Sequence, residues 1–196
     1  MDKTTGKTRY EDLILSLYDN GAVKFGEFTL VSGEKSKIYI DLRILVSYPK
    51  LMRQVTDELY EKGKTMTFDR VAGVPYAALP IVAVLSVHAG WPMIYNRKEK
   101  KDYGTKKNIE GIFNPNETVL VVDDLVTTGL SKINSIKVFE EAGLKVKDIL
   151  VLIDRSLGRA GLSLKEAGYN LHSIFKIEEM LDVLKAKGRV DPSFTL

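Results

Sequence analysis

Cysteine is absent from this chain of 196 residues, and histidine occurs only twice. Without cysteine the chain has no disulfide bonds, no thiol nucleophile and no cysteine-ligated metal, which is compatible with a reducing cytoplasm, where we expect the protein. The net charge is also small, +3 at pH 7. Proteins that bind nucleic acid or membranes over a whole surface are usually more basic, so we expect neither partner and only local recognition of anions.

Long uninterrupted hydrophobic segments are lacking too. The uncharged stretch at residues 71–96 contains three prolines and two glycines. These divide it into pieces shorter than the ~20 residues that a membrane-spanning helix needs. We therefore interpret it as a buried strand, a turn and a helix. The polar N-terminus has no apolar core of the kind found in signal peptides.

The remaining composition is that of a globular protein, with 44% hydrophobic and 28% charged residues. A chain of this length commonly forms one core, and no repeat or linker interrupts it, so we expect a single domain over residues 1–196. We predict helices at residues 9–18, 49–61, 77–88, 130–142, 162–167 and 178–187. We predict strands at residues 25–33, 36–43, 70–74, 92–95, 118–122, 149–153 and 171–175.

Alternating strands and helices predict an α/β fold, with a mainly parallel twisted sheet and helices on both faces. Ligands of such sheets bind beyond the carboxyl ends of the strands. The sequence VLVVDDLVTTG brings two acids, Asp123 and Asp124, to such an end. A Thr-Thr-Gly turn and a predicted helix follow them. The turn offers backbone N–H groups to a phosphate, and the carboxylates suit sugar hydroxyls or Mg²⁺.

Two simpler interpretations of this motif fit less well. One carboxylate would be enough to cap the following helix, whereas here there are two. The motif also lacks the Gly-Lys-Ser/Thr of a P-loop and the G-x-G-x-x-G of a dinucleotide site. It resembles the phosphoribosyl-pyrophosphate motif of the type I phosphoribosyltransferases, in which the acids contact the ribose and the turn holds the 5′-phosphate.

Three further segments resemble the orotate phosphoribosyltransferases within that family: FGEFTLVSGEKSKIYIDLR, RKEKKDYGTKKNIEG and LIDRSLG. With GVPYAALP, the resemblance covers residues 24–158 in uninterrupted order. It implies transfer of ribose 5-phosphate from phosphoribosyl pyrophosphate to orotate, giving orotidine 5′-monophosphate and pyrophosphate in pyrimidine biosynthesis. It also implies a type I phosphoribosyltransferase fold, whose N-terminal ~45 residues contribute a hood over the base.

The resemblance implies roles for individual residues. Lys101, Asp123 and Asp124 are the expected catalytic residues, and Tyr39, Ile40, Thr127 and Arg155 are the expected orotate contacts. Mg²⁺ is the expected cofactor, held mainly through the substrate and near Asp123 and Asp124. Phosphoribosyl pyrophosphate would contact Tyr76, Ala77, Arg97, Lys98, Lys101, Tyr103, Asp123, Asp124, Leu125, Val126, Thr127, Thr128, Gly129, Leu130 and Ser131.

The residues themselves support parts of this assignment. Arg155 can give orotate a bidentate guanidinium, although pairing with Asp154 or solvent is the simpler alternative. Tyr39 and Ile40 alternate along a strand, so only one of them can face the site. Residues 97–107 contain six basic and two acidic residues and would be a solvated face by composition alone. In the family this loop closes over the neighbouring subunit's site, which implies a homodimer with shared sites.

Some features depart from the family or need no catalytic role. Many relatives have lysine at Val31, and the usual Ser-Pro is Ser36-Lys37 here, so the N-terminal contacts are the least supported. Orotate is already an anion and demands no strong base, so we expect His88 and His172 to be structural. The chain is too short to include the decarboxylase domain that is fused to this activity in some organisms.

Two other functions remain open from the sequence. A phosphoribosyltransferase for another nucleobase, such as a purine, would share the Asp-Asp motif. A regulator that senses phosphoribosyl pyrophosphate without catalysis would also share it, although the basic loop favours an enzyme.

Overall fold

The computed structural model describes residues 9–29, 33, 35–97 and 108–196. Its helices and strands are, in chain order, α1 (Glu11–Asp19), β1 (Val23–Thr29), β2 (Lys35–Ile40), the 3₁₀ helix η1 (Leu42–Ser47), α2 (Pro49–Gly63), β3 (Arg70–Gly73), α3 (Ala78–Ala89), β4 (Met93–Asn96), β5 (Ile109–Glu110), β6 (Thr118–Val126), α4 (Leu130–Glu141), β7 (Lys145–Asp154), α5 (Arg159–Glu166), β8 (Asn170–Lys176) and α6 (Ile177–Ala186).

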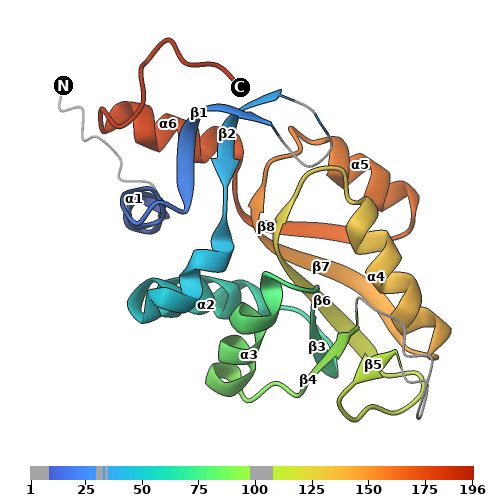
Figure 1. Ribbon diagram of the computed structural model, residues 1–196. Helices are drawn as coiled ribbons and strands as arrows, with labels where there is room; N and C mark the ends of the chain where they lie inside the picture. Colours follow the sequence, from blue (N-terminus) through green and yellow to red (C-terminus); the bar gives the residue numbers. More distant parts are fainter. Residues whose placement is uncertain (1–8, 30–32, 34, 98–107) are drawn as a thin grey trace, which may run out of the picture.

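A six-stranded sheet with the order β5-β4-β3-β6-β7-β8 forms the centre of the molecule (Figure 1). All its neighbouring strands are parallel except β4 and β5, which are antiparallel. Helices α2 and α3 lie on one face of the sheet, and α4 and α5 lie on the other (Figure 1). The predicted α/β fold with a mainly parallel sheet is confirmed.

Burial on both faces explains why β6 is aliphatic without polar alternation. Leu120 and Val122 belong to the core cluster that α2 and α3 share with the sheet. Val119 and Val121 point the opposite way, into the cluster under α4 and α5. Successive strand residues alternate between faces, so a strand covered on both sides needs an apolar residue at every position.

The N-terminal strands form a separate antiparallel ribbon, β1-β2, outside the main sheet. In Figure 1 this ribbon stands beside α6 and the C-terminal residues. Phe25 of β1 links the two ends of the chain, because its ring lies 6.0 Å from that of Tyr18 and 5.1 Å from that of Phe194. Ile38 and Ile40 of β2 enter the same core as α1 and α6.

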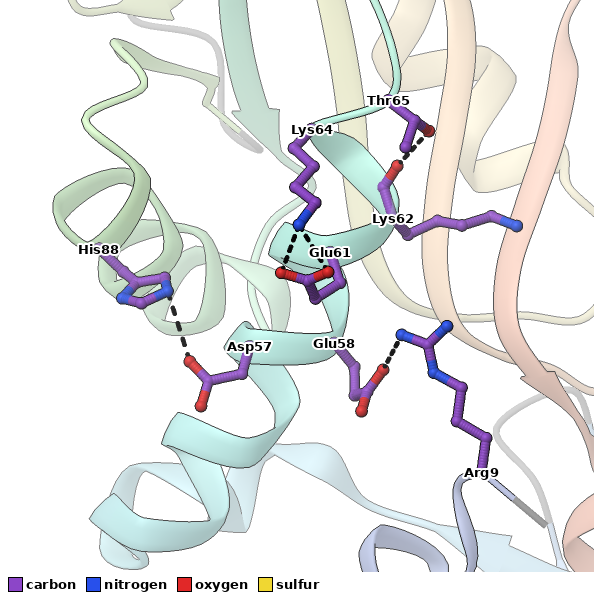
Figure 2. Close-up of polar contacts among 8 residues, drawn as sticks. All are labelled: Arg9, Asp57, Glu58, Glu61, Lys62, Lys64, Thr65 and His88. Atoms are coloured by element: carbon purple, nitrogen blue, oxygen red, sulfur yellow. Dashed lines mark hydrogen bonds and ion pairs between the residues drawn. The ribbon is translucent and has the colours of Figure 1, made fainter.

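Charged side chains join α2 to its neighbours at the surface (Figure 2). Arg9, just before α1, donates to Glu58 at 3.0 Å. His88 near the end of α3 lies 3.4 Å from the Asp57 carboxylate. Exposed pairs of this kind typically contribute only about 0–1 kcal/mol, so the apolar core dominates the packing of α2.

The structure corrects several predicted boundaries. The strand predicted at residues 118–122 continues to Val126, because β7 pairs with it along its whole length. The strand predicted at residues 36–43 ends at Ile40, since the Asp41 carboxylate accepts from the Arg43 N–H and starts η1. The helix predicted from residue 162 begins at Arg159, after Gly158 in a left-handed conformation. The strand β5 was not predicted.

The stretch at residues 71–96 forms β3, α3 and β4, as expected. Among the residues that the structure describes, no helix has the length and apolar character needed to cross a bilayer.

Candidate active site

The carboxyl ends of β3 and β6 form the point at which the chain reverses its progress across the sheet. From β3 the chain moves outward to β4, and it then returns to the other side of β3 as β6. The β3–β6 pairing ends at Gly73 and Val122, followed by one bond from the Val74 N–H to the Val122 carbonyl at 3.1 Å. Residues 123–126 then pair with β7. Ligands of open α/β sheets bind at such a reversal.

Asp123 and Asp124 therefore lie within the last part of β6 rather than after it. Asp123 is buried, and its carboxylate accepts from the Asp124 N–H at 2.8 Å. The Asp124 carboxylate accepts from the Leu125 N–H at 2.7 Å and remains half-buried. The two acids thus differ: the first points into the protein, and the second stays at the edge of the site.

Lys132 is the residue at this site that the sequence analysis missed. Its ammonium forms a buried ion pair with the Asp123 carboxylate, and the two side chains are only 7% and 6% exposed. In the helix predicted at residues 130–142, apolar residues recur at Ile133, Ile136, Phe139 and Ala142, whereas the buried residues of α4 are Lys132, Ser135, Ile136 and Phe139. Lys132 lies seven residues before Phe139 and four before Ile136. Helical periodicity therefore places it on the same buried face as these two residues.

The environment of Asp124 disfavours its charged form. Burial raises the pKa of Asp124 to about 7, and the neighbouring Asp123 charge adds to the effect, while Lys132 opposes it. A carboxyl group with such a pKa gains most from a ligand that brings hydrogen-bond donors or positive charge.

The turn after β6 presents groups suited to a phosphate. Thr127, Thr128, Leu130 and Ser131 are exposed, and Gly129 begins α4 in a left-handed conformation with φ 86°. Gly129 precedes α4 and has no side chain to cap it, and the Leu130 N–H makes a long contact of 3.5 Å with the Thr128 hydroxyl. The first N–H groups of α4 and the exposed hydroxyls beside them are therefore available to a phosphate. Leu125 is half-buried, whereas Val126 is fully buried and its carbonyl accepts from the Arg155 N–H at 3.0 Å, so the predicted contact at Val126 has no exposed atom in this structure.

A second helix start lies across the reversal point. Residues 74–77 connect β3 to α3, with Ala77 at the helix start and Tyr76 58% exposed. A cavity of about 490 Å³ runs from this connection to α4. Its lining includes Val74, Pro75, Arg97 and Ser131. Of the predicted phosphoribosyl-pyrophosphate contacts, Arg97 and Ser131 line this cavity, whereas Tyr76, Ala77 and residues 127–130 are not among its lining residues.

A second cavity, of about 290 Å³, lies between β2 and the ends of β6 and β7. We call it the cationic cavity, because no acidic side chain is among the described residues that line it, whereas four basic ones are. It is lined by Lys35, Ser36, Lys37, Ile38, Thr127, Arg155, Leu157, Arg159, Ile177 and Leu196.

Arg155 at the end of β7 is half-buried in this cavity. Burial lowers the pKa of Arg155, and its guanidinium lies 3.5 Å from the Ser36 hydroxyl. The Asp154 carboxylate accepts from the Ser156 N–H at 2.8 Å, and no pair between Asp154 and Arg155 occurs in the described part of the chain. A guanidinium in such a place can accept a planar carboxylate in bidentate fashion.

The two predicted contacts in β2 lie outside the lining of the cationic cavity. Ile40 is 8% exposed and belongs to the core. Tyr39 faces the other way, stacked on Phe28 at 5.4 Å, and its hydroxyl accepts from Arg43 at 3.1 Å. Ser36 and Ile38, which were not predicted, line the cavity in their place. Leu196 also lines it, although no motif in the sequence marked this residue.

Arg97 forms an ion pair with Glu110 across the antiparallel β4-β5 edge. Its backbone N–H donates to the Asn108 carbonyl at 2.8 Å, so residues 97 and 108 lie side by side. Lys98, Lys101 and Tyr103 lie outside the described residues, as does Val31. His172 pairs with Asp148 at 2.8 Å near the first residues of β7 and β8, away from the reversal point.

The carboxylates of this site suit a metal carried by the substrate. No group of three acidic, histidine or cysteine side chains that could hold a metal occurs in the described ranges. Asp123 is bound to Lys132, so Asp124 is the carboxylate left at the edge. Mg²⁺ commonly takes one or two carboxylates together with substrate phosphates, and this donor set fits that mode.

Known proteins resemble the chain along most of its length. It is 41% identical over 181 residues to the uridine 5′-monophosphate synthase of Bos taurus, covering 91% of this chain and 38% of the bovine protein. It is 35% identical over 174 residues to the orotate phosphoribosyltransferase of Pyrococcus abyssi, covering 88% of this chain and 95% of that protein.

A solved structure agrees with these relatives. The crystal structure of orotate phosphoribosyltransferase from Aeropyrum pernix has a TM-score of 0.76 and 34% identity, over 88% of this chain and 99% of that one. No family model matches the chain.

Asp124→Asn should change how the melting temperature depends on pH. The unfolded carboxyl group ionises near pH 4, whereas the folded one has a pKa of about 7. Ionisation of Asp124 therefore lowers the free energy of unfolding as the pH rises from about 4 to above 7. Asparagine cannot ionise, so the melting temperature of the variant minus that of the wild type should be larger at pH 8 than at pH 5.

Differential scanning fluorimetry over this pH range measures the difference. Asp182→Asn, which changes an exposed acid on α6, is the control and should show a constant difference. A constant difference for Asp124→Asn as well would contradict the raised pKa.

Gly129→Ala should destabilise the protein more than Gly158→Ala. Both glycines precede a helix, with φ of 86° and 84°, so alanine brings similar backbone strain of about 1–3 kcal/mol at each. At Gly129 the added Cβ would also lie 3.1 Å from Leu164, whereas at Gly158 no atom lies within 4 Å. Urea unfolding of the two variants measures the difference, and equal losses would mean that Leu164 moves aside freely.

Proposed function

The chain belongs to the orotate phosphoribosyltransferase family, and from this premise we propose that it transfers ribose 5-phosphate from phosphoribosyl pyrophosphate to N1 of orotate. The products are orotidine 5′-monophosphate and pyrophosphate, in the biosynthesis of pyrimidine nucleotides. The observation that carries the proposal is the convergence of Asp124, the turn at residues 127–131 and Arg155 at one edge of the sheet.

The end of β6 supports binding of the ribose phosphate. The 5′-phosphate would accept from the N–H groups and hydroxyls of residues 127–131 at the start of α4. Asp124 would accept from the ribose hydroxyls. As the bond to pyrophosphate breaks, positive charge develops on the ribose, and a nearby carboxylate stabilises it.

The cationic cavity supports an anionic, planar base. Arg155 would bind the orotate carboxylate, and Thr127, which lines the same cavity, connects it to the phosphate turn. A neutral purine would leave the half-buried guanidinium without an anionic partner, which favours orotate over that alternative. We also propose that the β1-β2 ribbon acts as the hood over the base, because Ser36 and Ile38 line this cavity.

Pyrophosphate is the leaving group and needs positive charge around it. The helix start at residues 74–77 and Arg97 border the cavity next to Ser131 and support this role. The family resemblance adds Lys98, Lys101 and Tyr103. When bound, Mg²⁺ would stabilise the charge on the pyrophosphate oxygens. The cytoplasmic location inferred from the composition stays a prediction.

We further propose that the protein acts as a homodimer with shared sites. The sequence of α3 is almost entirely apolar, yet Val87 is 86% exposed and Val84 is 37% exposed. Val46 of η1, which contacts α3, is also 59% exposed. A helix that is apolar on all sides is normally covered, and a second copy of the chain would cover this one.

The reaction itself gives the direct test. When purified protein is mixed with orotate, phosphoribosyl pyrophosphate and Mg²⁺, orotate should be consumed and its absorbance should fall. Arg155→Leu should raise the KM for orotate at least about tenfold and change that for phosphoribosyl pyrophosphate little. Arg155→Lys is the matched control, since it keeps the charge without the bidentate geometry, and its KM for orotate should lie between those of the wild type and Arg155→Leu.

Asp124→Asn and Lys101→Ala should each lower turnover at least about tenfold.

Product formed from hypoxanthine or adenine but not from orotate would overturn the choice of base. Near-normal turnover in both Asp124→Asn and Lys101→Ala would overturn the site assignment.

Val87→Glu should convert the dimer to a monomer, because it buries a charge in the proposed interface. Light scattering after size-exclusion chromatography measures the mass, and turnover should fall with it if the sites are shared. Leu162→Glu on α5 is the control, since Leu162 is 67% exposed on another surface and should leave the mass unchanged. A wild-type monomer, or a dimer that Val87→Glu leaves intact, would contradict the assignment.

A further inference from the structure

A single buried cation connects the two halves of the phosphoribosyl site. Lys132 is the only lysine or arginine among the buried residues in the described part of the chain. Its ammonium pairs with the Asp123 carboxylate and also donates to the Ser131 hydroxyl at 3.3 Å. Asp123 belongs to β6, and Ser131 belongs to the first turn of α4, so Lys132 joins both sides of the turn between them.

The bond network continues to Asp124. One oxygen of Asp123 faces Lys132, and the other accepts from the Asp124 N–H at 2.8 Å. The bond from the Asp124 N–H to the Asp123 carboxylate thus holds the backbone of Asp124. The ion pair with Lys132 holds that carboxylate in place. Asp123 has little surface to offer a ligand, because its side chain is only 6% exposed and both of its oxygens already have a partner in the protein.

The charge of Lys132 also matters for the ligand. Phosphoribosyl pyrophosphate carries several negative charges, and two uncompensated carboxylates would repel it across a partly desolvated site. With Lys132 bound to Asp123, the acid pair has a net charge of at most −1, and that charge belongs to Asp124.

We propose that Lys132 is a positioning residue for phosphoribosyl pyrophosphate, which ties the ribose-binding end of β6 to the phosphate-binding start of α4 and leaves Asp124 as the carboxylate that meets the ribose. The inference rests on the proposed function and deepens it. It gives the two adjacent acids different tasks: Asp123 anchors Lys132, and Asp124 contacts the ligand.

The test measures binding of phosphoribosyl pyrophosphate by calorimetry, separately from turnover. Lys132→Met should weaken binding at least about tenfold, with the KM for orotate changed less than about twofold. Lys132→Arg should recover most of the affinity, since arginine can keep both the ion pair and the hydroxyl contact. Lys147→Met, which changes an exposed lysine on β7, is the matched control and should bind normally.

A double variant separates positioning from stability. Lys132→Met alone leaves Asp123 as an unpaired buried charge and should lower the melting temperature, whereas removing both partners often restores stability. Lys132→Met with Asp123→Asn should therefore melt near the wild type. Binding should stay weak in this double variant, because the link to Ser131 is lost. This variant also keeps the test possible if Lys132→Met does not fold.

Recovery of both melting temperature and affinity in the double variant would overturn the proposal, since Lys132 would then serve stability alone. Normal affinity in Lys132→Met would overturn it too. Failure of the proposed function has a different signature: the wild type would bind phosphoribosyl pyrophosphate but form no product from orotate.

Discussion

The candidate site depends on β6 being longer than its pairing with β3. β3 ends at Gly73, which pairs with Val122, and the chain then turns away into α3, while β6 continues to Val126 along β7. Residues 123–126 therefore pair with β7 alone among the described strands, and their other edge borders the reversal point. The helix starts of α3 and α4, which follow β3 and β6, consequently lie near each other at this edge.

The charged groups at this edge differ in how far the protein itself neutralises them. The inner acid is neutralised within the protein by Lys132, and the outer acid has a pKa raised to about 7 by its burial. On the opposite side, Arg155 makes its hydrogen bond with a neutral hydroxyl, that of Ser36. The protein thus offsets its negative charges internally and leaves positive charge for ligands. A site built in this way suits substrates that are themselves anions, as phosphoribosyl pyrophosphate and orotate are.

The sequence predicted the fold class, most elements and the Asp-Asp turn, because these depend on local patterns. Continuous aliphatic strands, helix ends at glycine and the acid pair are all visible over ten residues or fewer. It did not predict the partner of Asp123, since a lysine is normally assigned to the solvated face of a helix, whereas Lys132 shares the buried face of α4 with Ile136 and Phe139. Nor could it choose between alternating residues of β2. The structure turns Ile40 into the core and Tyr39 toward Phe28, while Ser36 and Ile38 reach the cavity.

The cationic cavity shows why base recognition is harder to infer from sequence than phosphate recognition. The groups proposed to bind the 5′-phosphate come from one continuous segment, residues 127–131, whereas this cavity combines β2, the turn after β6, the end of β7 and Leu196. The position of β2 relative to the main sheet depends on contacts outside the site: Phe25 packs on Phe194, and Lys37 donates to the Thr195 carbonyl at 3.4 Å. The C-terminal residues therefore support one wall of the cavity and the strand that forms another. A change near residue 194 would alter the fit of the base more than the phosphate turn, because that turn is fixed mainly by β6 and α4, with Gly129 packed near Leu164 of α5.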